Sequence, residues 1–191
     1  MDSTEQFSVS TNLFSSLKQF PMNQVINAMN MKFPKVGQIS TSDLDIWLNN
    51  KNEAQPKIPK PEGKIVVLDV RPLEEYEVSH LKNSTRVDHN IENIGQFVNS
   101  FTTPDSKEPL TFACYCSVGY RSSLLGTRML DFFASEGITN INVFNVEGSL
   151  FKWGNEHRPM YNKNEEATVF VHPFNKVWGK LLDAELRKEK I

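Results

Sequence analysis

The sequence is short of cysteine, of net charge and of long apolar runs, and each shortage excludes a class of protein. Two cysteines in 191 residues are too few for a disulfide-stapled secreted scaffold, or for a zinc site built from spaced cysteine pairs. The 21 lysine and arginine residues nearly balance the 23 aspartate and glutamate residues, so a broad basic surface for nucleic acid or anionic lipid is not expected. Apolar runs are only a few residues long, which excludes a transmembrane helix.

The beginning of the sequence also lacks the marks of a targeting segment. Residues 1–12 hold Asp2 and Glu5 but no basic residue, whereas a secretory signal starts with a basic segment before an unbroken apolar stretch. The first arginine is Arg71, which argues against an arginine-rich transit peptide. We therefore expect a cytoplasmic protein, in a reducing compartment where a thiol stays free.

What is present is an alternation of apolar strands and amphipathic helices. Residues 65–70 hold five apolar residues in six, which is typical of a parallel strand buried on both faces, and residues 110–115 and 141–146 are similar. Residues 122–136 are predicted to form a helix whose apolar face carries Leu125, Met129, Phe132 and Phe133. This order predicts an α/β fold in a single domain, with a central, mostly parallel sheet and helices on both faces.

The chain divides into three expected parts, with a catalytic domain over residues 38–160 between two helical extensions. In the first extension, residues 1–37, short amphipathic turns of helix break near Pro21, and packing against the domain is favoured over a partner-binding arm. The second extension, residues 161–191, is expected to contain a helix whose apolar residues are Phe174, Val177, Trp178, Leu181 and Leu182.

The loop between the second strand and the long helix carries the candidate chemistry, and Cys116 begins it. In open α/β sheets, sites lie beyond the carboxyl ends of the strands. A loop that leads into a helix points backbone N–H groups and the positive end of the helix dipole at one spot. Both lower the pKa of a thiol placed there, and the same N–H groups can hold an anion that develops during a reaction. We therefore predict that Cys116 is a nucleophile.

The neighbouring residues are consistent with this hypothesis. Gly119 tolerates positive φ and leaves the backbone open to a ligand, while Arg121 would add a positive charge at the rim for an oxyanion such as thiosulfate. Cys114 lies inside the strand and is expected in the core, because a disulfide between residues i and i+2 would be strained. Asp69 and Arg71 end the first strand, where a structural ion pair is expected.

Four segments, taken in order, resemble the rhodanese sulfurtransferase family. Residues 116–122 look like its active-site loop, and residues 68–71 are similar to its first signature, an Asp-x-Arg that closes a strand. Residues 79–84 stand where the family usually has Gly-His-Ile-Pro-Gly-Ala, and residues 147–153 resemble the closing Gly-Gly-x-x-x-Trp segment, with Ser149 in place of the second glycine. The resemblance spans about residues 38–160.

The resemblance implies a thiosulfate or persulfide sulfurtransferase that needs no metal and no organic cofactor. Cys116 would take a sulfane sulfur from thiosulfate or a persulfide donor, hold it as a persulfide and pass it to a thiophilic acceptor, which in the cell includes thiols and proteins. No nucleic acid or membrane partner is expected. The residues expected to cradle the persulfide are Ser117, Val118, Gly119, Tyr120, Arg121 and Ser122, with Asp69 and Arg71 in support.

Two alternatives stay open at this point. A rhodanese-like domain can serve as a regulatory or binding module, although a retained Cys116 argues against an inactive one. The related cysteine-dependent phosphatases and arsenate reductases place five residues between cysteine and arginine, to wrap a tetrahedral oxyanion. Here four residues separate Cys116 from Arg121, and the shorter loop favours sulfur transfer.

Overall fold

Five parallel strands form the centre of the computed structural model, which describes residues 21–49, 55–103 and 106–190. The central strand, β4, is buried along its whole length because it has a strand on each side and helices on each face. In sheet order the strands are β1 (Gly37–Ile39), β5 (Ile141–Val146), β4 (Leu110–Tyr115), β2 (Lys64–Asp69) and β3 (Thr85–Arg86). The predicted α/β fold and its parallel sheet are therefore confirmed.

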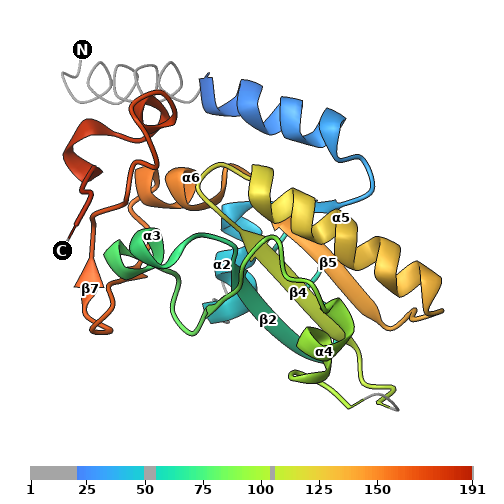
Figure 1. Ribbon diagram of the computed structural model, residues 1–191. Coiled ribbons are helices and arrows are strands. Elements are labelled where there is room, and N and C mark those ends of the chain that lie inside the picture. The colour runs from blue at the N-terminus through green and yellow to red at the C-terminus, as the bar shows by residue number, and fades with distance from the viewer. Residues whose placement is uncertain (1–20, 50–54, 104–105, 191) are drawn as a thin grey trace.

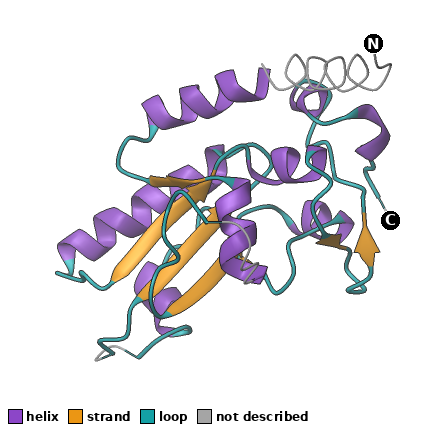
Figure 2. Cartoon of the chain, turned by 180° about the vertical axis from the view of Figure 1, so that it is seen from behind, coloured by secondary structure: helices purple, strands orange, loops and turns teal. Residues whose placement is uncertain are grey.

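Helices cover both faces of the sheet, and Figures 1 and 2 show the two sides. One face packs against α4 (Ile94–Asn99) and α5 (Tyr120–Ser135) through an apolar cluster that includes Leu68, Phe112 and Leu125. The other face packs through Val67, Ala113 and their neighbours. Its helices are α2 (Thr41–Asn49), α6 (Ser149–Asn155) and the helix over residues 21–32. The short α3 (Leu73–Val78) follows β2.

The described part of the first extension, residues 21–37, packs on the domain, as expected. In both ribbon views the helix over residues 21–32 lies along the top of the molecule above α5 (Figures 1 and 2). Its Met22 and Ile26 are buried in the same apolar cluster as Leu150 and Phe151 of α6. The predicted turns of helix before Pro21 lie outside the described residues.

The second extension contains the expected helix only as short 3-10 turns. It holds a two-stranded hairpin of β6 (Met160–Tyr161) and β7 (Ala167–Thr168), then two short 3-10 helices, η1 (Trp178–Leu181) and η2 (Ala184–Leu186). Val171, Leu182 and Leu186 pack into the domain core from extended or 3-10 segments. These three apolar residues therefore hold residues 169–190 against the domain as an irregular segment, here called the strap. Packing of their side chains outweighs the local preference for an α-helix.

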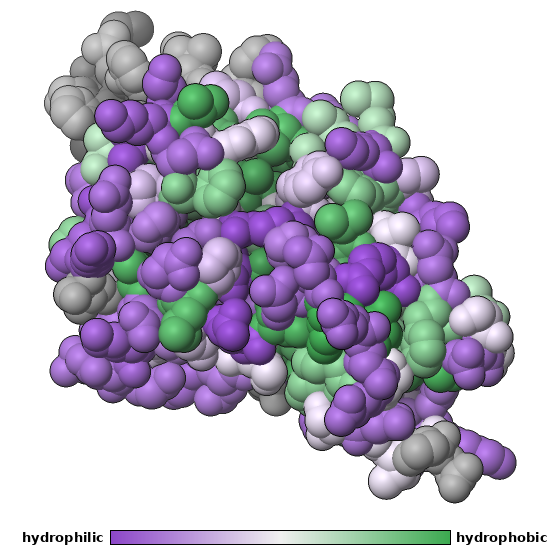
Figure 3. Space-filling model, viewed as in Figure 1, coloured by the Kyte–Doolittle hydropathy of each residue, from purple (hydrophilic) through white to green (hydrophobic). Residues whose placement is uncertain are grey.

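The surface agrees with the near-neutral composition. Hydrophilic side chains cover most of the face shown in Figure 3, and apolar ones are scattered between them. Among the residues that the structure describes, no helix has both the length and the apolar character that a membrane span requires.

Candidate active site

Cys116 lies directly after β4, at the carboxyl edge of the sheet, and its residue exposure is 1%. Its backbone N–H donates to Ser149 Oγ at 3.2 Å, and its carbonyl accepts the N–H of Leu150 at 3.0 Å. Ser149 adopts a φ of 50°, a region that favours glycine, and its hydroxyl also donates to the Val146 carbonyl. The serine that replaces the family's second glycine thus ties Cys116 to the start of α6.

The loop then turns back over the sulfur atom. Gly119, with φ of 109°, is the N-cap of α5, and its N–H donates to Cys116 Sγ at 3.2 Å. A side chain at this position would be strained by the backbone angle, and its Cβ would lie 3.2 Å from Asn145 Nδ2. The glycine therefore allows the turn that brings the N–H onto the sulfur.

We expect Gly119→Ala to lower both stability and thiol reactivity. Holding alanine at this φ should cost about 1–2 kcal/mol of unfolding free energy, and relief of the strain would move the N–H away from Cys116. Gly137→Ala is the matched control, because Gly137 also has positive φ (68°) but nothing lies within 4 Å of an added Cβ. Denaturant unfolding and the pH dependence of Cys116 alkylation measure both effects. An unchanged alkylation profile in Gly119→Ala would contradict the assigned contact.

Arg121 is held by a buried carboxylate that the sequence analysis did not assign to the site. Glu75 of α3 accepts Nη1 of Arg121 at 2.8 Å through Oε1 and Nη2 at 3.0 Å through Oε2. The Ser117 hydroxyl donates to the same Oε2 at 2.7 Å and accepts from Arg121 Nη2 at 2.9 Å. Because both charges are removed from water, the pair fixes the guanidinium beside the loop.

Burial and the loop act in opposite directions on the thiol of Cys116. Burial raises its pKa, whereas the charge of Arg121 and hydrogen bonds from Ser122 and Gly119 lower it, and the net pKa lies below its ordinary value. Cys114, fully buried inside β4, has no such compensation, and burial raises its pKa to about 12. The lowered pKa makes the thiol of Cys116 the more reactive of the two, whereas Cys114 is an unreactive residue of the core.

Among the other loop residues, Ser122 and Val118 turn their side chains into the protein, whereas Tyr120 is partly exposed. Ser122 Oγ donates to Asn145 Oδ1 at 2.7 Å, and Val118 is buried in the apolar core beside the helix over residues 21–32. Tyr120 is 41% exposed, and its ring contacts that of Phe33 at 5.4 Å between centroids. A ligand at Cys116 would thus meet mainly the backbone of the loop.

Asp69 and Arg71 form the structural ion pair expected at the end of β2. Arg71 Nε donates to Asp69 Oδ1 at 2.8 Å, Nη2 donates to Oδ2 at 2.6 Å, and both side chains are fully buried. Arg71 Nη2 also donates to the carbonyl of Ser79, which fixes the segment after α3. The pair stabilises the carboxyl edge of the sheet, from which the loop that begins with Cys116 extends.

Both extensions reach the loop, which the sequence analysis did not foresee. From the first, Met29 Cγ lies 3.8 Å from where a Cβ on Gly119 would be, and the Lys32 ammonium lies 4.8 Å from the Tyr120 ring centroid. From the second, the ring of Phe174 lies 4.9 Å from the Arg121 guanidinium carbon. Residues outside 38–160 therefore build part of the surroundings of the Cys116 loop.

Metal ligands do not gather in the part of the chain that the structure describes, where no group of three or more His, Cys, Asp or Glu side chains is placed to hold an ion.

The fold and the loop define a class of protein, an α/β domain with a cysteine at the turn from a central strand into a helix. The model of the rhodanese-like domain family matches residues 47–156, more than half of the chain. The chain therefore belongs to the rhodanese-like domain family, as the four motifs predict. No curated protein matches it.

Several solved structures are similar at low sequence identity. The BH2092 protein from Bacillus halodurans is 22% identical, with 71% of this chain and 85% of that chain covered and a TM-score of 0.45. A thiosulfate sulfurtransferase from Pseudomonas aeruginosa is 15% identical, with 74% and 23% covered and a TM-score of 0.47. Saccharomyces cerevisiae Ygr203w, described as a homolog of single-domain rhodanese and of the Cdc25 phosphatase catalytic domain, is 12% identical, with 65% and 86% covered and a TM-score of 0.48.

Proposed function

We propose that the protein is a sulfurtransferase that carries a sulfane sulfur on Cys116. The observation that carries the proposal is the placement of Cys116 Sγ, which lies at a strand end, accepts the N–H of Gly119 and has its pKa lowered by Arg121. A thiolate in a loop of converging N–H groups is suited to accept and release one sulfur atom.

The transfer has two half-reactions. The Cys116 thiolate attacks the outer sulfur of thiosulfate, a sulfur–sulfur bond forms, and sulfite leaves with the electron pair of the bond that breaks. A persulfide donor reacts in the same way and releases a thiolate. A nucleophilic acceptor, either a small thiol or a thiol on a protein, then attacks the outer sulfur and restores the Cys116 thiolate. Neither step requires a metal or an organic cofactor, and ping-pong kinetics follow.

The ion pair at the site refines the role expected of Arg121. Two of its nitrogen atoms already donate to Glu75, so its charge is partly neutralised within the protein. We propose that Arg121 chiefly stabilises the thiolate, and that the backbone N–H groups of residues 117–122 hold the anionic donor. The proposed site therefore has the same residues as the sequence predicts, but Arg121 stabilises the thiolate and does not bind the donor.

A direct comparison of substrates tests the proposal against the phosphatase alternative. We expect thiocyanate to form from thiosulfate and cyanide, at a rate that Cys116→Ser abolishes, and no turnover of p-nitrophenyl phosphate. The loop holds four residues between cysteine and arginine, one fewer than the phosphatases use to wrap a tetrahedral anion. Turnover of the phosphate ester without sulfur transfer would overturn the proposal, and the absence of both activities would favour a binding module.

A further inference from the structure

At one edge of the central sheet, the edge strand β3 pairs with only two of the six residues of β2. β3 pairs with Leu68 and Asp69 of β2, and no strand among the described residues pairs with residues 64–67 on that side. The N–H groups of Lys64 and Val70 donate toward β4, so the backbone groups of the odd-numbered residues between them point to the outer edge. Ile65 and Val67 therefore present backbone groups along an edge that β3 does not reach.

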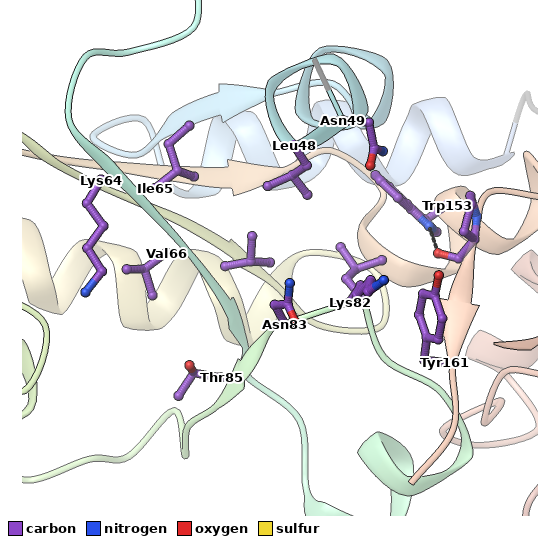
Figure 4. Close-up of a pocket in the computed structure, with 13 residues that line it drawn as sticks. Leu48, Asn49, Lys64, Ile65, Val66, Lys82, Asn83, Thr85, Trp153 and Tyr161 are labelled. Atoms are coloured by element: carbon purple, nitrogen blue, oxygen red, sulfur yellow. Dashed lines mark hydrogen bonds between the residues drawn. The ribbon is translucent and has the colours of Figure 1, made fainter. Parts of the chain in front are cut away.

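A cavity of about 450 Å³ lies along this edge, apart from Cys116 (Figure 4). It touches four consecutive residues of β2, residues 64–67, and the side chains of Ile65, Val66 and Val67 alternate between the two faces of the sheet. A cavity that contacts all three must face the strand's edge. Its walls come from the end of α2, the turn before β3, α6 and β6, with Leu48, Asn49, Lys82, Asn83, Trp153 and Tyr161 around it.

The shape and charge of the cavity indicate its occupant. The uncovered stretch is four residues long, or about 13 Å in an extended chain, which matches a short strand and not a folded element. None of the cavity's lining residues is acidic, and its basic residues are Lys64, whose ammonium donates to the Phe101 carbonyl at 3.1 Å, and Lys82. Lys82 is exposed, with its ammonium 5.4 Å from the centroid of the Tyr161 ring. Extended backbone with acidic side chains complements this surface.

We propose that the edge of β2 at residues 64–67 binds an acidic, extended peptide segment of a partner protein as an added strand. The peptide backbone pairs with the outward N–H and C=O groups of Ile65 and the N–H of Val67, in line with β3. Its acidic side chains meet Lys82, and its apolar side chains enter the cavity beside Leu48 and Trp153. Main-chain pairing supplies the affinity of such a contact, and the flanking pockets supply its selectivity.

The test uses the full chain and fluorescein-labelled six-residue peptides of alternating valine and glutamate. We expect saturable binding by fluorescence anisotropy, loss of binding when alternate peptide amides are N-methylated, and about tenfold weaker binding to Lys82→Glu. Lys107→Glu, also exposed but outside the cavity, is the matched control and should bind like the wild type. Bound peptide should shift the amide resonances of Ile65, Val67 and Thr85.

A second variant separates edge pairing from simple charge attraction. Ile65→Pro removes an outward N–H that the β2–β4 ladder does not use, so the fold should persist by circular dichroism while peptide binding falls. Cys116→Ser should bind normally, because the site does not include the thiol. Equal binding of a valine–lysine peptide, or resonance shifts away from the edge, would overturn the proposal. So would concentration-dependent self-association of the chain that Lys82→Glu abolishes, since the edge would then serve a second copy.

Discussion

Arg121→Ala is expected to slow alkylation or sulfur loading of Cys116 about 100-fold at neutral pH, the order of magnitude by which loss of one hydrogen-bond donor to a developing anion slows an enzyme. Without Arg121, burial, which raises the pKa of the thiol, is opposed only by the hydrogen bonds from Ser122 and Gly119, so the pKa of Cys116 should rise. Less thiolate then exists at neutral pH, and the pH–rate profile should move to higher pH. The profile, measured with iodoacetamide, distinguishes a lost thiolate from lost donor binding.

The same substitution should also destabilise the fold. It leaves the Glu75 carboxylate, whose side chain is 3% exposed, without its partner, and breaking such a pair costs about 3 kcal/mol. Glu75→Gln in the Arg121→Ala background removes the unpaired charge and should recover most of the unfolding free energy. It should not recover reactivity, because the cation that lowers the pKa of Cys116 is still missing.

The double variant makes the two roles of Arg121 separable. Urea unfolding and alkylation kinetics of the wild type, both single variants and the double variant give the coupling energy between Glu75 and Arg121. If Arg121→Ala retains the wild-type pH–rate profile, Arg121 does not lower the pKa of the Cys116 thiol. If the double variant is as unstable as Arg121→Ala, the unpaired carboxylate is not the cause of the loss.

Local sequence pattern predicted the scaffold of the site well. The apolar runs at residues 110–115 and 141–146 are the strands β4 and β5 with the same bounds, and Cys116 follows the first of them. Gly119 adopts the positive φ that its residue type permits. These features depend on short-range properties, namely strand burial and backbone freedom, that a sequence displays directly.

Contacts between distant segments could not be predicted in the same way. The acidic residues of α3 suit a helix N-terminus, but only the pairing of β2 beside β4 brings Glu75 to Arg121. The signal was an acidic residue shortly after one strand and an arginine shortly after its neighbour, since both strand ends lie on one edge. Phe174 belongs to the irregular strap, whose path is set by packing. No sequence pattern therefore predicts that its ring lies against Arg121.

We propose that Cys116 carries the transferred sulfur. Incubation of the wild type with thiosulfate should form a persulfide on Cys116 alone, because Cys114 is buried with a pKa of about 12. Loading should slow as the pH falls through the lowered pKa of Cys116, since protonation removes the nucleophile. Cys116→Ser should not load, whereas Cys114→Ser should load like the wild type.

The most direct measurement is the intact mass of the protein before and after thiosulfate, followed by cyanide. We expect a gain equal to one sulfur atom. Cyanide should reverse the gain, peptide mapping should place it on Cys116, and Cys116→Ser should lack it. No gain at neutral pH, or a gain that survives in Cys116→Ser, would contradict the proposal.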